Sequence, residues 1–316
     1  MRDIPSETTV QPAAVAQGRP AVLGSRHMVS SSHYLASLAG LRMFPRGGSA
    51  IDAGIAAGIA LNVVERHLTD FGGVAPIMVY LPGMAEPETI DGLGRWPASL
   101  DLATYRARYG DDMPIGIPRS VTPGAPDAWL TALARYGRLT LADVLAPAIE
   151  LCDGFPVFPR LAVAIERLEG RIRQWPSSAA VFLPGGRPPR AGEILVQPEL
   201  GRFFRRLVAI ESAHSTRGRA AAIMAARDAI YRGDIAREIV AFMEREGGAL
   251  GAEDLEGHRA TTEPAVHTTY RGIDVYACGP WSQGPLVPMT LNMLEGFDIA
   301  SMGPGSLAFL HRFTEA

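Results

Sequence analysis

The stretch that most constrains this chain covers residues 40–80, because it contains a helix with almost no polar side. Residues 53–64 carry no charge, and Ala and Gly alternate there with Ile, Leu and Val. A helix that is apolar nearly all round lies inside a protein, and this one is too short to cross a bilayer, which takes about 20 apolar residues. A continuous apolar run of strand length follows at 76–81. A buried helix that leads into a buried strand predicts the centre of a layered α/β core.

Both ends of this helix are marked in the sequence. Ser49 stands at the N-cap position and Asp52 follows three residues later, an acidic variant of the capping box. Glycines inside the helix lower its intrinsic stability, so we expect neighbouring elements to approach its backbone closely. Residues 65–67 end the helix, and a turn at 70–73 precedes the strand.

The composition indicates a globular protein and excludes several kinds of chemistry. The chain has 316 residues, of which 47% are hydrophobic and 20% charged, enough for one large domain or two ordinary ones. A net charge of -3 gives no reason to expect a nucleic acid or an acidic membrane as partner. All 30 basic residues are Arg, so these residues supply no Schiff-base lysine, no pyridoxal-phosphate anchor and no P-loop lysine.

Cysteine and histidine spacing predicts neither a metal nor a cofactor. Cys152 and Cys278 lack metal-ligand spacing and are expected to be isolated buried thiols. The seven histidines show no HExxH or paired spacing. His67 is the one candidate, since it lies beside the glycine turn, although a hydrogen-bonded core histidine is the favoured interpretation. The first 24 residues are polar and rich in Pro and Ala without the apolar core of a signal peptide, which predicts a flexible tail and a cytoplasmic location.

The remaining periodicity is mostly helical, with no internal repeat and no linker that divides residues 25–316. We expect short strands at 27–30 and 88–91 and a hairpin formed by 266–269 and 273–277. The expected helices are 32–44, 101–109, 127–136, 141–152, 160–175, 199–211, 220–231, 235–246, 285–295 and 306–316.

Several sequence blocks follow one another in the order found in the large subunit of the γ-glutamyltranspeptidase family, which the chain resembles from about His27 to Ala316. The matching residues are Ser37, Ala39, Gly40, Gly47, Gly48, Ala50, Asp52 and Ala53, then Val63, Val64, Glu65, His67, Gly72 and Gly73, then Thr122-Pro123-Gly124, Gly154-Phe155-Pro156-Val157, Tyr231-Arg232-Gly233, Gly247-Gly248, Glu263-Pro264, Tyr270-Arg271-Gly272 and Leu291-Asn292-Met293-Leu294-Glu295.

This resemblance implies an N-terminal-nucleophile hydrolase with a four-layer αββα sandwich, an α+β fold of which this chain supplies the helical layers and part of the sheets. It implies a proenzyme that cleaves itself, so that the new N-terminal Thr of a small subunit attacks an amide carbonyl with its own α-amine as base. Nearby donors would stabilise the oxyanion. The implied partners are the small subunit from the same precursor and a small-molecule amide substrate.

The nucleophile of the family lies in a T-T-H-type motif, downstream of everything in this chain. Thr261-Thr262 precedes Glu263 and Thr268-Thr269 precedes Tyr270, so neither pair matches that motif. Both pairs are expected to be ordinary strand or loop residues, since Thr is a β-former. No catalytic residue is therefore assigned within the chain.

Three residues are candidates for binding the substrate. The family motif D-x-R-E-x-A-P aligns with residues 91–97, which places Leu93 where the family has the Arg that grips a glutamyl carboxylate, and Gly94 where it has Glu. Arg95 could bind the carboxylate instead, or it could be a solvated surface residue. Asp70 could face the substrate or cap its own turn. Trp281, in the loop 279–284 that replaces a P-P-S-S-G-G type loop, could also face it.

The resemblance implies a γ-glutamyltransferase-like or hydrolase-like amidohydrolase that acts on a γ-glutamyl or related amide. Leu93 favours an alternative, an acylase of the same superfamily that acts on a non-γ-glutamyl amide of the cephalosporin type or on a small amide. A third hypothesis is a truncated, non-catalytic relative that serves as a binding or assembly partner. A serine hydrolase is disfavoured, because Ser282 lacks a G-x-S-x-G elbow.

Overall fold

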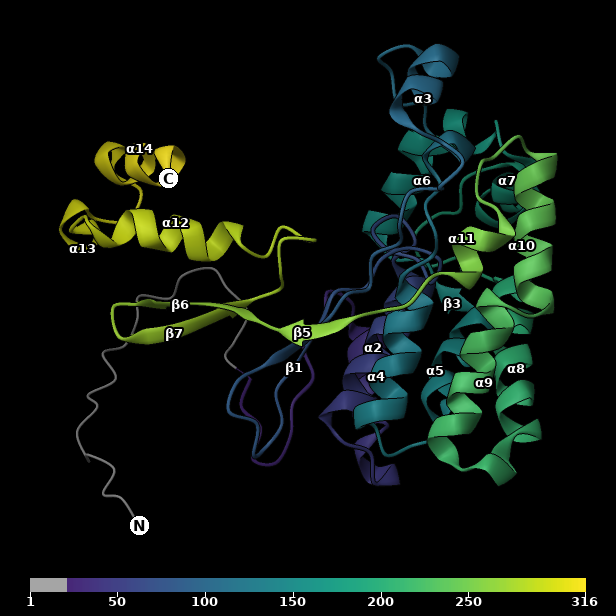
Figure 1. Cartoon of the computed structure of the whole chain (residues 1–316), viewed down its shortest axis with the longest axis horizontal. Coiled ribbons are helices and arrows are strands. Elements are labelled where there is room, and N and C mark those ends of the chain that lie inside the picture. The colour runs from purple at the N-terminus through teal and green to yellow at the C-terminus, as the bar shows by residue number, and fades with distance from the viewer. Residues whose placement is uncertain (1–21) are drawn as a thin grey trace.

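The computed structural model describes residues 22–316. The tail expected over residues 1–24 falls largely outside this range, and within it Val22, Leu23 and Gly24 are exposed and have no regular structure. The described chain forms a helical body with two small sheets, and an arm that extends from it (Figure 1). No helix among residues 22–316 is long and apolar enough to span a membrane.

The elements are as follows. The helices are α1 (Tyr34–Leu41), α2 (Ala50–Val64), α3 (Leu102–Tyr109), α4 (Ala125–Tyr136), α5 (Leu141–Asp153), α6 (Pro159–Ile172), α7 (Pro176–Phe182), α8 (Pro198–Ala213), α9 (Arg219–Tyr231), α10 (Asp234–Arg245), α11 (Ala252–Glu256), α12 (Leu286–Glu295), α13 (Ile299–Met302) and α14 (Leu307–Glu315), with short 3-10 turns at Phe44–Arg46, Ile117–Arg119, Pro184–Gly186 and Ser215–Arg217. The strands are β1 (Ile77–Val79), β2 (Glu88–Ile90), β3 (Phe155–Pro156), β4 (Ile194–Leu195), β5 (Thr262–Pro264), β6 (Val266–Tyr270) and β7 (Ile273–Ala277).

Helix α2 is the buried centre of the body, and the predicted capping box opens it. The Ser49 hydroxyl accepts hydrogen bonds from the first turn, while the Asp52 carboxylate accepts the Ser49 N–H at 2.7 Å. Asp52 also accepts the N–H groups of Arg138 and Leu139, each at 2.9 Å, so it ties the turn between α4 and α5 to the start of α2. Burial would raise the pKa of this carboxyl, but these hydrogen bonds outweigh it and the pKa is lowered.

Helices α1, α4 and α5 pack around α2, and α8 and α9 extend the helical layer beyond them (Figure 1). The expectation that the glycines of α2 admit close neighbours holds at Gly58, where a Cβ atom would overlap the indole ring of Trp129. It is wrong at Gly54, which faces open space.

The main sheet is antiparallel with the strand order β1-β2-β5. Ile77 pairs with Ile90, and Thr89 pairs with Glu263. Strand β1 was expected to be buried throughout, yet Val79 is 1% exposed while Met78 is 39% exposed. Successive strand residues point to opposite faces, and the face of Met78 is covered in part, since Thr89, which pairs with Met78, is buried.

The arm comprises residues 266–316, namely the predicted hairpin β6–β7 followed by α12, α13 and α14 (Figure 1). Strands β6 and β7 pair from Val266–Ala277 to Tyr270–Ile273, and α12 packs on them. The residues of the large buried core all precede the arm, so the arm adds little to the packing of the body.

Three local expectations are wrong. Residues 27–30 form no strand, because no other strand pairs with them. The helix expected over 32–44 covers only Tyr34–Leu41, with His33 as its N-cap. The Ser32 hydroxyl bonds the carboxylate of Glu65 instead of starting the helix. The helix expected over 160–175 stops at Ile172, and Pro176 starts the separate helix α7.

Candidate functional site

Loops from distant parts of the sequence meet at the edge of the main sheet. The first is the glycine turn 70–73, which is closed by a hydrogen bond from the N–H of Gly73 to the carbonyl of Asp70 (3.1 Å). The carbonyl of Gly73 then accepts the N–H groups of Gly124 (3.1 Å) and Ala125 (2.9 Å). The turn after α2 is thereby fixed to the start of α4.

The loop 91–95, which aligns with the carboxylate-binding motif, is held from three sides. Ala75 donates to the carbonyl of Gly92 (3.0 Å), and the N–H of Asp91 donates to the carbonyl of Thr261 (2.9 Å). Thr122 donates to the carbonyl of Arg95 (3.0 Å). Within the loop, the Asp91 carboxylate accepts the N–H of Leu93 at 2.8 Å, an Asx-type turn.

Backbone contacts leave no room for a side chain at position 94. A Cβ atom on Gly94 would overlap the carbonyl oxygen of Thr122, and one on Gly124 would overlap the carbonyl oxygen of Gly92. The Glu that the family motif has at position 94 therefore does not fit this backbone. Glycine at position 94, where the family motif has Glu, allows the loops 91–95 and 122–125 to pack closely.

We call the loops 70–73, 91–95 and 122–125 the loop cluster. Arg95 belongs to it through the hydrogen bond from Thr122, and Asp70 through its place in the glycine turn. The Arg95 side chain is exposed and makes no ion pair with any residue among 22–316. Asp70 closes its turn with its backbone carbonyl, while its carboxylate makes no hydrogen bond to the described chain. Both side chains are free to meet a ligand, and their roles in binding substrate stay predictions.

Trp281 is anchored to the sheet by a different contact. Its indole N–H donates to the carboxylate of Glu263 on β5, and Glu263 pairs with Thr89 of β2. This hydrogen bond fixes the loop between β7 and α12 to the sheet. No contact links Trp281 to Arg95 or Asp70, so its substrate role also stays a prediction.

Ser282 and the threonine pairs serve local structure. The Ser282 hydroxyl donates to the carbonyl of Gly279 and accepts the N–H of Gly284, both at 3.0 Å, which closes its own turn. Thr262 lies on β5, and Thr269 on β6 bonds Asp274 at 2.9 Å. Burial raises the pKa of the Cys152 thiol to about 12, which makes it a poor nucleophile. Among residues 22–316 no group of three His, Cys, Asp or Glu is placed to hold a metal ion.

Sequence reasoning missed a buried ionic network behind the loop cluster. Arg227 of α9 is 1% exposed and forms a bidentate ion pair with Asp127 of α4, with both N–O distances 2.7 Å. Arg227 also donates to the carbonyl of His258 at 2.7 Å. The ring of Tyr231 stacks on His258 and lies under the Arg227 guanidinium, 4.7 Å from ring centroid to carbon. The one sequence feature that could have indicated this network is an Arg within the Ala-rich run 219–231.

This network holds the backbone on which the loop cluster rests. The Asp127 carboxylate accepts the N–H of Ala260 at 2.7 Å, next to Thr261, and the Tyr231 hydroxyl donates to the carbonyl of Pro123 at 2.5 Å, next to Gly124. Burial would raise the pKa of Asp127, but the hydrogen bond and charge of Arg227 outweigh it and the pKa is lowered. The pair therefore remains ionised and holds both loops in place.

Comparison with known proteins agrees with this fold. A gamma-glutamyltranspeptidase family model matches residues 36–316. The glutathione hydrolase-like YwrD proenzyme of Bacillus subtilis is 34% identical over 298 residues, covering 93% of this chain and 54% of that protein. The acylase ACY 1 proenzyme of a Pseudomonas species is 34% identical over 309 residues, covering 93% of this chain and 52% of that protein. The gamma-glutamyltranspeptidase of Helicobacter pylori superposes with a TM-score of 0.83 at 25% identity, covering 94% of this chain and 82% of that chain.

By fold the chain is thus an N-terminal-nucleophile hydrolase, with the mixed helices and sheets that the sequence predicts. It belongs to the gamma-glutamyltranspeptidase family, a family of enzymes. It spans about half the length of the curated relatives it matches.

Proposed function

We propose that this chain is the large-subunit part of an amidohydrolase or acyltransferase of the γ-glutamyltranspeptidase type. The family match over residues 36–316 carries the proposal. The catalytic Thr lies on a following segment, which self-cleavage of a common precursor releases as the small subunit. That the matched relatives are proenzymes supports this arrangement. A cytoplasmic location remains a prediction from the sequence.

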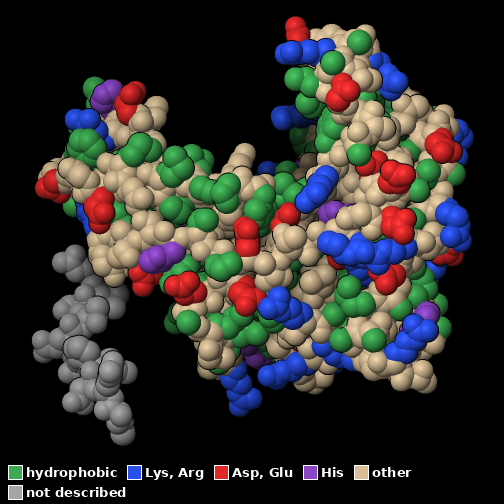
Figure 2. Space-filling model, viewed as in Figure 1, with side chains coloured by type: hydrophobic (Ala, Val, Ile, Leu, Met, Phe, Trp, Pro, Cys, Tyr) green, Lys and Arg blue, Asp and Glu red, His purple; other side chains and the backbone are tan. Residues whose placement is uncertain are grey.

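The arm is the surface where the small subunit would dock. Helices α12 and α14 expose apolar side chains along the arm, between 48% and 84% exposed (Figure 2). These residues are Leu286, Val287, Met289 and Met293 on α12, and Leu307, Leu310 and Phe313 on α14. An apolar surface of this extent is unusual on an unpartnered protein, and Met78 of β1, on the adjoining sheet, is 39% exposed. Strands of the small subunit would cover both.

The reaction that we propose is acyl transfer in two steps. The Thr hydroxyl attacks the amide carbonyl while the α-amine of the same Thr takes the hydroxyl proton. The tetrahedral oxyanion is stabilised by N–H donors and then collapses, the amine leaves with that proton, and an acyl ester remains on Thr. Water or a second amine then attacks the ester. The loop cluster would hold the acyl group, with Arg95 as the cation nearest the family's binding motif.

One observation favours a donor other than a γ-glutamyl amide. Leu93 replaces the Arg of the family motif, and Gly94 has no space for the neighbouring Glu. An aliphatic side chain cannot replace a bidentate Arg–carboxylate contact. The acylase relative is as similar to this chain as the glutathione hydrolase-like one. We therefore propose an acylase-type substrate as the second candidate.

Expression of the complete gene tests both proposals. The purified protein should run as two chains on a denaturing gel, and replacement of the Thr at the new N-terminus should leave one uncut chain. A protein that stays single from a gene with no downstream Thr motif would leave only the non-catalytic hypothesis. Turnover of γ-glutamyl anilides compared with glutaryl and other acyl anilides then decides between the two substrate classes.

A further inference from the structure

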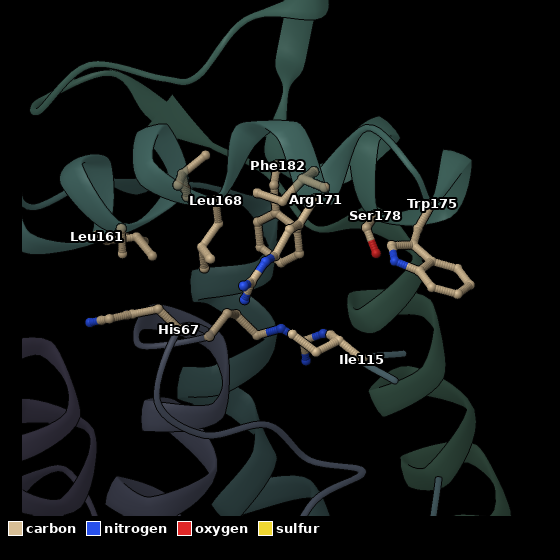
Figure 3. Close-up of a pocket in the computed structure, with 12 residues that line it drawn as sticks. His67, Ile115, Leu161, Leu168, Arg171, Trp175, Ser178 and Phe182 are labelled. Carbon is tan, nitrogen blue, oxygen red and sulfur yellow. The ribbon is translucent and has the colours of Figure 1, made fainter. Parts of the chain in front are cut away.

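A pocket of about 300 Å³ lies between α6, α7 and the segment that follows α2 (Figure 3). Most of its wall is apolar, formed by Leu161, Ile165, Leu168, Ile172, Trp175 and Phe182. None of its lining residues belongs to the loops 70–73, 91–95 or 122–125, so it is separate from the loop cluster. Its volume is at the lower end of the range for small-molecule sites.

The charged groups at this pocket are both cations, beside the neutral polar groups of His67 and Ser178. Arg66 and Arg171 line it, and Figure 3 shows the Arg171 side chain directed from α6 into the space above His67. No carboxylate lines the pocket, and neither Arg forms an ion pair with any residue among 22–316. Arg66 instead lies over the ring of Phe182, 5.9 Å from its centroid. The contrast with Arg173 is direct, because that residue pairs with Glu169 at the surface of the same helical segment.

The excess of positive charge continues across α6. A second, more open cavity shares His67 and Leu168 with the pocket and adds Arg160 and Arg167, again without a carboxylate in its lining. Elsewhere on the described surface some Arg side chains, such as Arg205 and Arg206, are paired with acids, while others, such as Arg95, are not. Unpaired cations around an apolar pocket favour a ligand that carries the missing negative charge.

His67 provides a second indication of a missing partner. Both of its ring nitrogens are buried, and neither has a hydrogen-bond partner in the described chain. Buried polar atoms are paired in the great majority of cases. Burial lowers the pKa of His67, so its ring is neutral near pH 7 and offers one N–H donor.

We propose that this pocket binds an amphipathic organic carboxylate, with its charged end at Arg66 and Arg171 and an alkyl or aryl body against the side chains of α6 and α7. The arginines select the anion through charge-assisted hydrogen bonds, and the apolar wall selects the body. The volume suits an acyl chain of about eight carbons. This site is additional to the amide-cleaving function, and does not depend on it.

Calorimetric titration of the protein purified from its complete gene tests the proposal, with sodium octanoate as the probe. Octan-1-ol and octylamine are matched controls with the same body and a neutral or positive head. Octanoate should bind saturably and on the order of tenfold more tightly than either control. Each methylene removed, from octanoate to hexanoate, should weaken binding about threefold to fourfold.

Two substitutions locate the anion. Arg171→Gln and Arg66→Gln should each weaken octanoate binding about tenfold, whereas Arg173→Gln, two residues from Arg171 and outside the pocket, should leave it unchanged. Thermal melts of all three variants establish that each is folded. Equal affinity for octanoate and octanol, unchanged affinity when both Arg66 and Arg171 are replaced, or no saturable binding of octanoate would each overturn the proposal. None of these readouts requires enzyme activity.

Discussion

Arg227 and Asp127 are the charged pair on which the loop cluster most depends. Both side chains are at most 2% exposed, and each satisfies backbone groups as well as its partner. Removal of one member of such a pair leaves an uncompensated buried charge, which costs about 3–5 kcal/mol. Loss of Arg227 or Asp127 should therefore lower the free energy of unfolding far more than loss of a surface ion pair, which contributes about 0–1 kcal/mol.

We predict that Arg227→Gln lowers the free energy of unfolding by about 3–5 kcal/mol. The control is Arg206→Gln, which removes an Arg from a surface cluster with Asp234 and Glu238 and should cost less than about 1 kcal/mol. Urea titrations of both variants followed by circular dichroism measure the difference. Similar losses in the two variants would contradict a supporting role for the buried pair.

Three histidines, of which His33 and His258 are buried and His67 is partly buried, predict how stability depends on pH. Burial lowers the pKa of His33, His67 and His258 below the ordinary value of 6.5. Between the lowered pKa and 6.5 the unfolded chain binds protons that the folded chain does not. Stability is therefore full above pH 6.5 and decreases as the pH falls below it.

Asp52 and Asp127, whose carboxyl pKa values are lowered in the folded chain, add to this loss only at lower pH. The stability that they provide is fully present above their unfolded pKa of 3.8. Melting temperatures measured from about pH 7 to about pH 5 isolate the histidine contribution. A variant with His258→Phe should lose less stability over this interval than the native chain. An identical slope would assign the pH dependence to other groups.

Arg95 is the residue at which the substrate proposal can be tested most directly. If it binds the carboxylate of an acyl donor, Arg95→Gln should raise KM about tenfold or more with a smaller change in kcat. The matched control is Arg106→Gln on α3, whose only ionic contact within residues 22–316 is with Asp111 at the surface. Unchanged KM for all carboxylate-bearing substrates would assign Arg95 to the solvated surface.

At the scale of the helix, α2 offers an internal comparison between two glycines. Gly54 faces open space, so Gly54→Ala should stabilise the protein by about 0.5–1 kcal/mol through helix propensity. Gly58 contacts Trp129, so Gly58→Ala should displace that ring and destabilise by about 1–3 kcal/mol. Thermal melts of the two variants should shift in opposite directions. A shift of the same sign in both would mean that Trp129 can move without loss.

At this scale, the elements that could be predicted from sequence are those determined by residues close together in the chain. The capping box at Ser49 and the hairpin β6–β7 were predicted correctly, because each needs only neighbouring residues. The pair β3–β4 was missed, since its strands join positions 155 and 195. The strand expected at 27–30 failed for the same reason: an apolar pattern does not show whether a partner strand exists.

The candidate site shows the same limit. Sequence reasoning placed Asp70 and Arg95 near glycine-rich loops, and the structure joins both loops to residues 122–125. It did not find the network of Arg227, because the two partners are 100 residues apart and only the fold brings them together. The need for a glycine at position 94 could likewise not be predicted, because it arises from close contact with the carbonyl oxygen of Thr122 in the folded chain.

On the scale of the whole molecule, the body buries its apolar side chains while the arm exposes many of its own. The large buried core lies entirely within the helical body, whereas the arm keeps Leu286, Met289 and Leu307 between 59% and 84% exposed. At roughly 25 cal/mol per Å², covering several hundred Å² of such surface contributes about 10 kcal/mol, comparable with the stability of a whole domain. The body should therefore fold alone, and the arm should depend on its partner.

We predict that residues 1–316, produced without any following segment, are aggregation-prone and cleave no γ-glutamyl amide. A chain that ends at Ala265 lacks the arm and should remain monomeric, with a cooperative melt, because its core is intact. Size-exclusion chromatography and calorimetry of the two chains measure this difference, and co-expression with the small subunit should restore a soluble complex of the longer one. A sharp melt from monomeric residues 1–316 would show that the arm needs no cover. Turnover by that chain, free of every trace of small subunit, would place the nucleophile within these residues and contradict its assignment to a following segment.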